Sequence, residues 1–127
     1  MQIALWLAAL GVADALSAQP KTKHVLVPIA DGTEEIEVVT VVDVLRRAGA
    51  EVVLASVEDD DRLSVICSRG VKIEADCNIK AVTGRQGRDW DLIAIPGGMP
   101  GAERIRDSVR LHPALEKHWR ALRPFAM

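Results

Sequence analysis

The stretch His24–Gly49, HVLVPIADGTEEIEVVTVVDVLRRAG, decides the fold because it predicts a buried strand, a tight turn and a helix in succession. Its first six residues are almost all apolar, a pattern typical of a parallel strand covered on both faces. Asp31 and Gly32 follow with turn chemistry, and Asp31 with Glu34 three residues later predicts an acidic capping box. Gly49 is a natural left-handed stop after the helix.

The predicted helix has an apolar face and charged ends that suit the helix dipole. Acidic side chains are favoured in the first turn, where backbone N–H groups are exposed, and basic side chains are favoured in the last turn. The acids there are Glu34, Glu35 and Glu37, and the apolar residues at helical spacing are Val38, Val41, Val42, Leu45 and Ala48. A second apolar run, 51–56, follows directly and completes a βαβ unit with two parallel strands.

Composition describes a globular chain of at most one domain, with 127 residues, 49% hydrophobic residues and a formal charge of −2. The absence of a basic surplus argues against a nucleic-acid partner. Two cysteines are too few for a disulfide scaffold, so the core has to come from packed aliphatic side chains. A cytoplasmic location is the default expectation.

Residues 1–21 form an apolar leader and linker with no Lys or Arg before Lys21. The run 3–13 is too short to span a bilayer, so we expect no stable membrane insertion, but it has the length of a signal-peptide core. A cleaved targeting segment, an amphipathic leader and the remnant of a preceding segment all remain open. An organellar or secretory location follows only if the segment is a targeting signal.

The middle of the chain predicts smaller elements. The runs 63–67 and 71–74 flank a Ser-Arg-Gly turn and predict a short antiparallel hairpin. The acidic run 58–61 lacks the ligand spacing of a calcium loop and predicts a solvated surface loop. Residues 76–88 predict one or two helical turns followed by a polar loop.

The second informative stretch is 90–105, WDLIAIPGGMPGAERI, where a strand at 91–95 is ended by Pro96 and followed by glycines and a new helix. In an open parallel sheet, a loop at the carboxyl end of a strand is where ligands bind. Gly97 and Gly98 could present N–H groups to an oxyanion, or could simply form a turn that needs positive φ. A last helix at 113–122 and the start of a strand at 123–127 follow.

Four motifs occur in a diagnostic order: ADGTEEIE at 30–37, DVLRRAG at 43–49, CSRGVKI at 67–73 and DLIAIPGGMPGAE at 91–103. Together they resemble the DJ-1/PfpI (ThiJ) superfamily, in its DJ-1-like branch, and make residues 22–127 a partial domain of that type. The resemblance implies an α/β fold, a flavodoxin-like (class I glutamine amidotransferase-like) three-layer sandwich with a mainly parallel sheet, truncated before the nucleophile elbow.

The resemblance also implies a function. Such proteins are typically homodimers, use no cofactor or metal, and are described as glyoxalase III or deglycase-type enzymes for methylglyoxal and glycated groups, with chaperone and oxidative-stress roles. Glu37 matches the acid partner of the reactive cysteine, and Gly97 and Gly98 match the N–H donors beside it. The residues that match the dimer interface and pocket are Glu34, Arg47, Cys67 and Arg69. From the residues alone, Glu37 is instead a surface acid favoured by the helix dipole.

The family cysteine stands on an elbow after the strand that 123–127 begins. Neither Cys67 nor Cys77 fits that place, because both precede the glycine loop. Three hypotheses follow: a piece of a glyoxalase or deglycase that is inactive as written, a non-catalytic chaperone-like or stress-sensing protein that dimerises, and a dinucleotide-binding half. The turn ADGTEE lacks the glycine fingerprint and disfavours the third.

Overall fold

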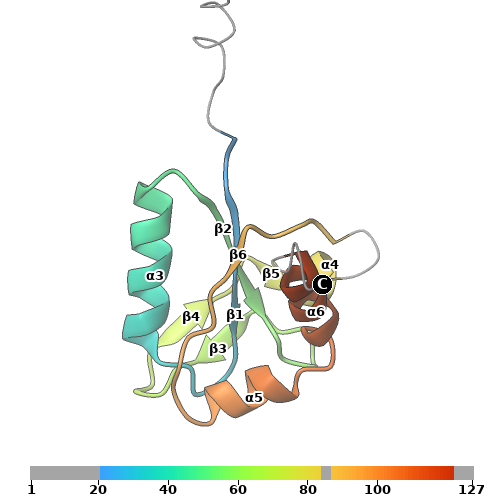
Figure 1. The fold of residues 1–127 in the computed structure, drawn as a ribbon. Helices are drawn as coiled ribbons and strands as arrows, with labels where there is room; N and C mark the ends of the chain where they lie inside the picture. The colour runs from blue at the N-terminus through green and yellow to red at the C-terminus, as the bar shows by residue number, and fades with distance from the viewer. Residues whose placement is uncertain (1–20, 84–86, 122–127) are drawn as a thin grey trace, which may run out of the picture.

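The computed structural model describes residues 21–83 and 87–121, which form a sheet with helices on both of its faces (Figure 1). The helix α3 and a small hairpin cover one face, and α4 and α6 lie on the other side. The elements are β1 (His24–Ile29), α3 (Glu35–Arg47), β2 (Glu51–Ser56), β3 (Ser64–Ile66), β4 (Lys72–Glu74), β5 (Cys77–Asn78), α4 (Lys80–Thr83), β6 (Leu92–Ile93), α5 (Gly101–Asp107) and α6 (His112–Ala121).

The main sheet has the strand order β5-β2-β1-β6, and every pairing in it is parallel. The register of β1 with β2 runs from His24 opposite Glu51 to Ile29 opposite Ser56. This confirms the predicted βαβ unit and the mainly parallel sheet. Because parallel strands end at a common edge, the loops after β1 and β6 meet at one end of the sheet.

Side chains of β1 alternate between two apolar cores. Val25, Val27 and Ile29 pack with Val38 of α3 in one cluster, whereas Leu26 packs in a second cluster that includes Ile105 and Leu111. All four β1 side chains are at most 2% exposed. The near-continuous apolar run of this strand therefore reflects burial on both faces, as the sequence predicted.

The C-terminal end of α3 confirms the predicted glycine stop. Gly49 has φ 84°, and its N–H donates to the Arg46 carbonyl at 3.0 Å. The Ala50 N–H donates to the Leu45 carbonyl at 3.0 Å. These two bonds form a Schellman motif, which satisfies helix carbonyls and turns the chain directly into β2.

The predicted capping box at the other end of α3 is wrong. The N-cap is Glu34, which makes no side-chain cap hydrogen bond. Asp31 instead accepts a hydrogen bond from the Ile66 N–H at 2.8 Å and pairs with Arg62 at 2.6 Å. Strand β3 and Arg62, which precedes it, offer Asp31 stronger partners than the helix does, because Arg62 is a cation.

Glu58 also departs from the expectation of a solvated loop at 58–61. Its side chain is buried, at 8% exposed, whereas the three aspartates that follow are exposed. Glu58 accepts a hydrogen bond from the Asp31 N–H at 2.8 Å and pairs with Arg62 at 3.1 Å and Arg104 at 3.2 Å. A buried carboxylate is tolerated here because two guanidinium groups and a backbone N–H surround it.

The remaining elements agree with the sequence in outline. The hairpin is confirmed as β3 and β4, and the last helix is confirmed as α6, with Leu122 outside the described residues. The strand predicted at 91–95 is present as β6 but covers only Leu92–Ile93, and the short strand β5 was not predicted. Residues 1–20 and 123–127 lie outside the described part. None of the described helices is long and apolar enough to cross a membrane.

Asp31→Asn tests the link between the first turn and the hairpin. Burial raises the pKa of Asp31, but the Ile66 N–H and Arg62 outweigh it and hold the net pKa below its usual value. A lowered pKa contributes stability above the unfolded-state value of about 3.9 and loses it as the pH falls through the folded-state value. We expect Asp31→Asn to lower the free energy of unfolding by about 1–3 kcal/mol at neutral pH.

Urea unfolding at several pH values measures this effect. The difference between the wild type and Asp31→Asn should begin to shrink as the pH falls below about 4, where the unfolded-state carboxylate takes up a proton, and should vanish once the folded-state carboxylate, with its lower pKa, is protonated too. Glu74→Gln on the exposed strand β4 is the matched control and should change little. A difference that stays constant with pH would contradict the assignment to the ionised carboxylate.

Candidate active site

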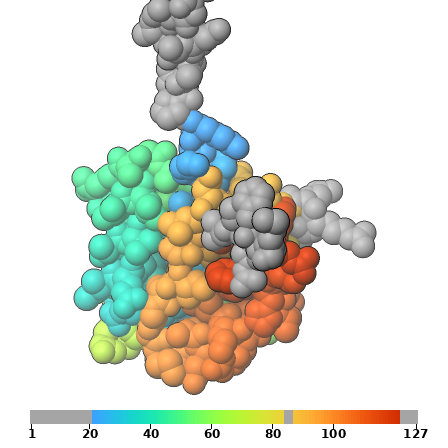
Figure 2. All heavy atoms as spheres, in the orientation of Figure 1, coloured from blue at the N-terminus to red at the C-terminus, as the bar shows by residue number. Residues whose placement is uncertain are grey.

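Glu37 and Gly97 meet at the carboxyl edge of the parallel sheet, although they are 60 residues apart in the sequence. The first turn of α3 carries Glu37, and the loop after β6 carries Gly97. The Gly97 N–H donates to Glu37 Oε2 at 2.6 Å, a short charge-assisted hydrogen bond. Figure 2 shows the segment after β6, in orange, packed directly against α3. The structure therefore brings together the predicted acid and one predicted backbone donor.

The glycine loop packs backbone against backbone on the turn between β1 and α3. The Glu34 N–H donates to the Gly97 carbonyl at 2.9 Å. A Cβ at Gly98 would lie closer than 3.0 Å to Glu34 N and the Gly32 carbonyl oxygen, and a Cβ at Gly101 would meet the Thr33 backbone as closely. Gly98 has φ 94°, which confirms that a positive-φ turn is needed at that position.

An apolar cavity of about 340 Å³ opens beside Glu37. Glu37, an exposed residue, is the only charged residue among those that line it. The other lining residues are Val27, Ile36, Val38, Thr40, Val41, Ala94, Ile95 and Pro96. The volume is within the range of small-molecule sites.

A second polar cluster ties the start of α3 to the β3–β4 turn. Ser68 Oγ lies 2.6 Å from Glu34 Oε2 and 2.9 Å from Glu35 Oε2, and its single O–H donates to one of them at a time. The Arg69 N–H donates to Glu35 Oε1 at 3.0 Å. The pKa of Glu35 lies below its usual value because of its own backbone N–H, Ser68 and Arg69, which outweigh burial.

Neither cysteine has the environment of a reactive thiolate. Cys67 is 4% exposed, and burial raises its pKa, as do the nearby charges of Glu35, Glu34 and Asp31. Burial and Asp76 raise the pKa of Cys77. Reactive cysteines need the opposite setting, an electropositive and partly exposed one.

The four residues predicted for the dimer interface and pocket do not all lie together. Glu34 and the turn residues Cys67 and Arg69 lie at the N-terminal end of α3. Arg47 lies at its C-terminal end, about 20 Å away along a helix of this length, and pairs with Asp43 at 2.9 Å. The roles of all four in an interface remain predictions.

Sequence reasoning missed three residues that organise the site. Glu35 is buried and holds the hairpin turn, Ser68 bridges two carboxylates, and Thr33 is fully buried. Thr33 accepts a hydrogen bond from the Ala30 N–H through Oγ1 at 3.0 Å, and its carbonyl accepts one from the Ser68 N–H. Nothing in the local sequence distinguishes Glu35, which is buried, from Glu34 and Glu37, which are half-buried and exposed.

A parallel sheet with helices on both faces and a carboxylate at its carboxyl edge defines an α/β protein of flavodoxin-like fold. The family model described as the DJ-1/PfpI family matches residues 23–127, and the chain belongs to that family. No group of three or more potential ligand side chains that could hold a metal ion is found among the described residues.

Relatives and solved structures agree with this assignment. The chain is 54% identical to oxidized Toxoplasma gondii DJ-1, with a TM-score of 0.72, over 79% of this chain and 52% of that one. It is 41% identical to Protein DJ-1 homolog B of Arabidopsis thaliana, over 82% of this chain and 23% of the relative. It is 36% identical to the glutathione-independent glyoxalase DJR-1.2 of Caenorhabditis elegans, over 71% of this chain and 44% of the relative. The chain thus spans about half or less of the length of these proteins.

Gly98→Ala tests the close approach of the two loops. Positive φ costs a non-glycine residue about 1–2 kcal/mol, and forced overlap in a packed site adds about 1–3 kcal/mol. We expect Gly98→Ala to lower the free energy of unfolding by about 2–5 kcal/mol. Gly70→Ala is the matched control, since Gly70 has φ 84° but no atom within 4 Å of an added Cβ. Equal losses in urea unfolding would refute the steric contribution.

Proposed function

We propose that this chain supplies the acid and the glycine loop of a DJ-1/PfpI-type site that acts on small reactive carbonyl compounds or glycated groups, as glyoxalase III and deglycase-type enzymes do. The observation that carries the proposal is the 2.6 Å contact between Glu37 Oε2 and the Gly97 N–H. The cavity beside it and the relative named as a glyoxalase support the proposal.

The chemistry assigns separate roles to these groups. The thiolate of the family cysteine adds to the carbonyl carbon of the substrate, and the π electron pair of the carbonyl moves to its oxygen. This oxygen becomes an oxyanion, which then accepts a proton. Glu37 accepts the proton of the cysteine thiol as the thiolate forms, backbone N–H groups of Gly97 and Gly98 stabilise the oxyanion, and Glu37 then returns the proton to the oxyanion. Since the Gly97 N–H already donates to Glu37, a substrate oxygen has to share or displace that hydrogen bond.

The thiolate is the group that this sequence does not supply in a suitable place. Its two cysteines both have raised pKa values, and Cys67 is buried in the hairpin turn. We therefore propose that the 127-residue chain does not turn over methylglyoxal by itself. A chain continued through the family's cysteine elbow gains a nucleophile next to Glu37 and the glycine loop.

The test compares methylglyoxal consumption by two proteins. The 127-residue chain should match its own Cys67→Ser, Cys77→Ser double variant. A chimera that continues after residue 127 with the remainder of Toxoplasma gondii DJ-1 should be active. Within the chimera, Glu37→Gln should lower kcat/KM roughly a hundredfold or more, because a positioned acid–base group contributes that much.

Glu116→Gln is the matched control, since it removes the same charge from an exposed site on α6 and should leave kcat/KM unchanged. Turnover by the unextended chain that disappears in the double cysteine variant would overturn the proposal. So would a chimera in which Glu37→Gln and Glu116→Gln behave alike.

A second candidate function, a non-catalytic homodimer with a chaperone-like or stress-sensing role, is favoured by exposed apolar side chains. Ile36 is 71% exposed and Val39 57% exposed on α3, and Ile66 and Val71 are 47% and 49% exposed on the hairpin. Ser68 links these two elements through Glu34. We propose that this helix–hairpin surface, defined by the four apolar residues, is where two copies associate.

Ile36→Glu should weaken self-association, because a charge placed in an apolar interface loses hydration without gaining a partner. Sedimentation should then show a lower average mass than for the wild type at equal concentration. Val109→Glu is the control, as Val109 is 73% exposed and lies away from α3 and the hairpin. Arg69→Glu changes a charge beside the N-terminal end of α3, and Arg47→Glu changes one at its C-terminal end. Comparing their sedimentation shows whether both ends of the helix contribute to self-association. Identical sedimentation of Ile36→Glu and the wild type would exclude this surface.

A further inference from the structure

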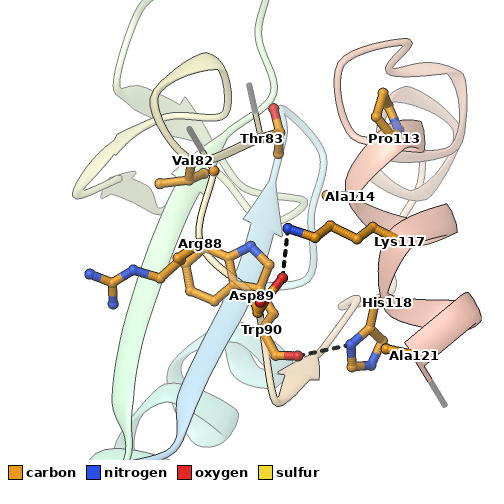
Figure 3. Close-up of a pocket in the computed structure, with 11 residues that line it drawn as sticks. Val82, Thr83, Arg88, Asp89, Trp90, Pro113, Ala114, Lys117, His118 and Ala121 are labelled. Atoms are coloured by element: carbon orange, nitrogen blue, oxygen red, sulfur yellow. Dashed lines mark hydrogen bonds and ion pairs between the residues drawn. The ribbon is translucent and has the colours of Figure 1, made fainter. Parts of the chain in front are cut away.

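A cavity of about 330 Å³ lies on the side of the sheet that α4 and α6 cover, at the end of the β6 segment opposite the Glu37 site. Its polar lining includes Trp90, Asp89 and Lys117, and apolar walls come from residues such as Val82 and Ala114 (Figure 3). No group of the proposed active site lines this space, so the two sites are independent.

The cavity contains a buried donor without a partner. Trp90 is 8% exposed, and its indole Nε1 has no hydrogen-bond partner among the described residues. Buried indole N–H groups usually find an acceptor, because leaving them unpaired loses the hydrogen bond they make with water. An acceptor other than the described residues is therefore expected at this position.

The indole ring is held in place by its neighbours. Arg88 stacks over the ring at 5.7 Å from its centroid. His118 Nδ1 donates to the Trp90 carbonyl at 3.0 Å, which ties the start of the β6 segment to α6. The donor is thus preorganised, and a ligand need not order it on binding.

Lys117 supplies a positive charge next to this donor. Its ammonium extends from α6 toward the indole and pairs with Asp89 at 2.6 Å (Figure 3). An ammonium has three donors, so the contact with Asp89 leaves others for a ligand. Asp89 also offsets part of the charge, which favours an anion with a single charge over a dianion such as phosphate.

We propose that this cavity binds a small monocarboxylate, whose two oxygens accept hydrogen bonds from Trp90 Nε1 and Lys117 Nζ while its apolar body contacts Val82, Pro113 and Ala114. A carboxylate fits because its two oxygens accept from two donors at once. The volume accommodates such a molecule, and the apolar walls contribute by excluding water from it.

The test uses benzoate as the probe and the ¹⁵N-labelled 127-residue chain. The indole N–H resonance of Trp90, identified by its loss in Trp90→Phe, should shift saturably with benzoate. Trp90→Phe keeps an aromatic ring but removes the donor, and it should weaken binding, followed by calorimetry, roughly tenfold or more. Lys117→Gln should weaken it several-fold. Lys72→Gln, on the exposed strand β4, should bind benzoate as the wild type does.

Benzyl alcohol separates the carboxylate site from a merely apolar hollow. It should bind much more weakly than benzoate, and equal binding would overturn the proposal. The absence of a saturable shift at millimolar benzoate would overturn it as well, and would assign the indole N–H to water. If Trp90→Phe does not fold, Lys117→Gln and benzyl alcohol still decide, because neither alters the core.

Discussion

The hydrogen bond from the Glu34 N–H to the Gly97 carbonyl, at 2.9 Å, is the contact on which the rest of the candidate site depends. It joins the loop after the central strand β1 to the loop after its neighbour β6. Gly98 and Gly101 have no room for a side chain at this junction, since a Cβ at either position would overlap the opposing backbone. Only after the two loops meet this closely can Glu37 reach the Gly97 N–H.

Charged side chains then hold the first of these loops from the other side. Asp31 binds the hairpin through the Ile66 N–H, while Glu58 accepts a hydrogen bond from the Asp31 N–H and pairs with Arg104 of α5. Glu35 and Ser68 fasten the hairpin turn to the start of α3. The proposed active site thus rests on long-range contacts between elements that are each too short to be stable alone.

Local pattern was enough to predict β1, α3 and β2, because the apolar run, the helical spacing and the Gly49 stop are all encoded within 33 residues. It failed at Asp31, whose partners Ile66 and Arg62 are 35 and 31 residues away. The pairing of Glu37 with Gly97 spans 60 residues and came from the family resemblance, since no local pattern distinguishes Glu37 from its neighbouring acids. Glu35 and Ser68 were missed for the same reason.

The burial of Glu58 has a consequence for where this chain tolerates a change in length. Glu58 is fastened by three partners, whereas Asp59 and Asp60 directly after it are exposed. Additional residues inserted after Asp59 cost loop-closure entropy, which grows slowly with length, and at most the exposed ion pairs that Asp60 makes with Arg62 and Asp61 with Lys80. A deletion that shifts Glu58 by one position instead separates it from the Asp31 N–H and both arginines. The boundary between a length-tolerant and a length-intolerant segment therefore falls between residues 58 and 59.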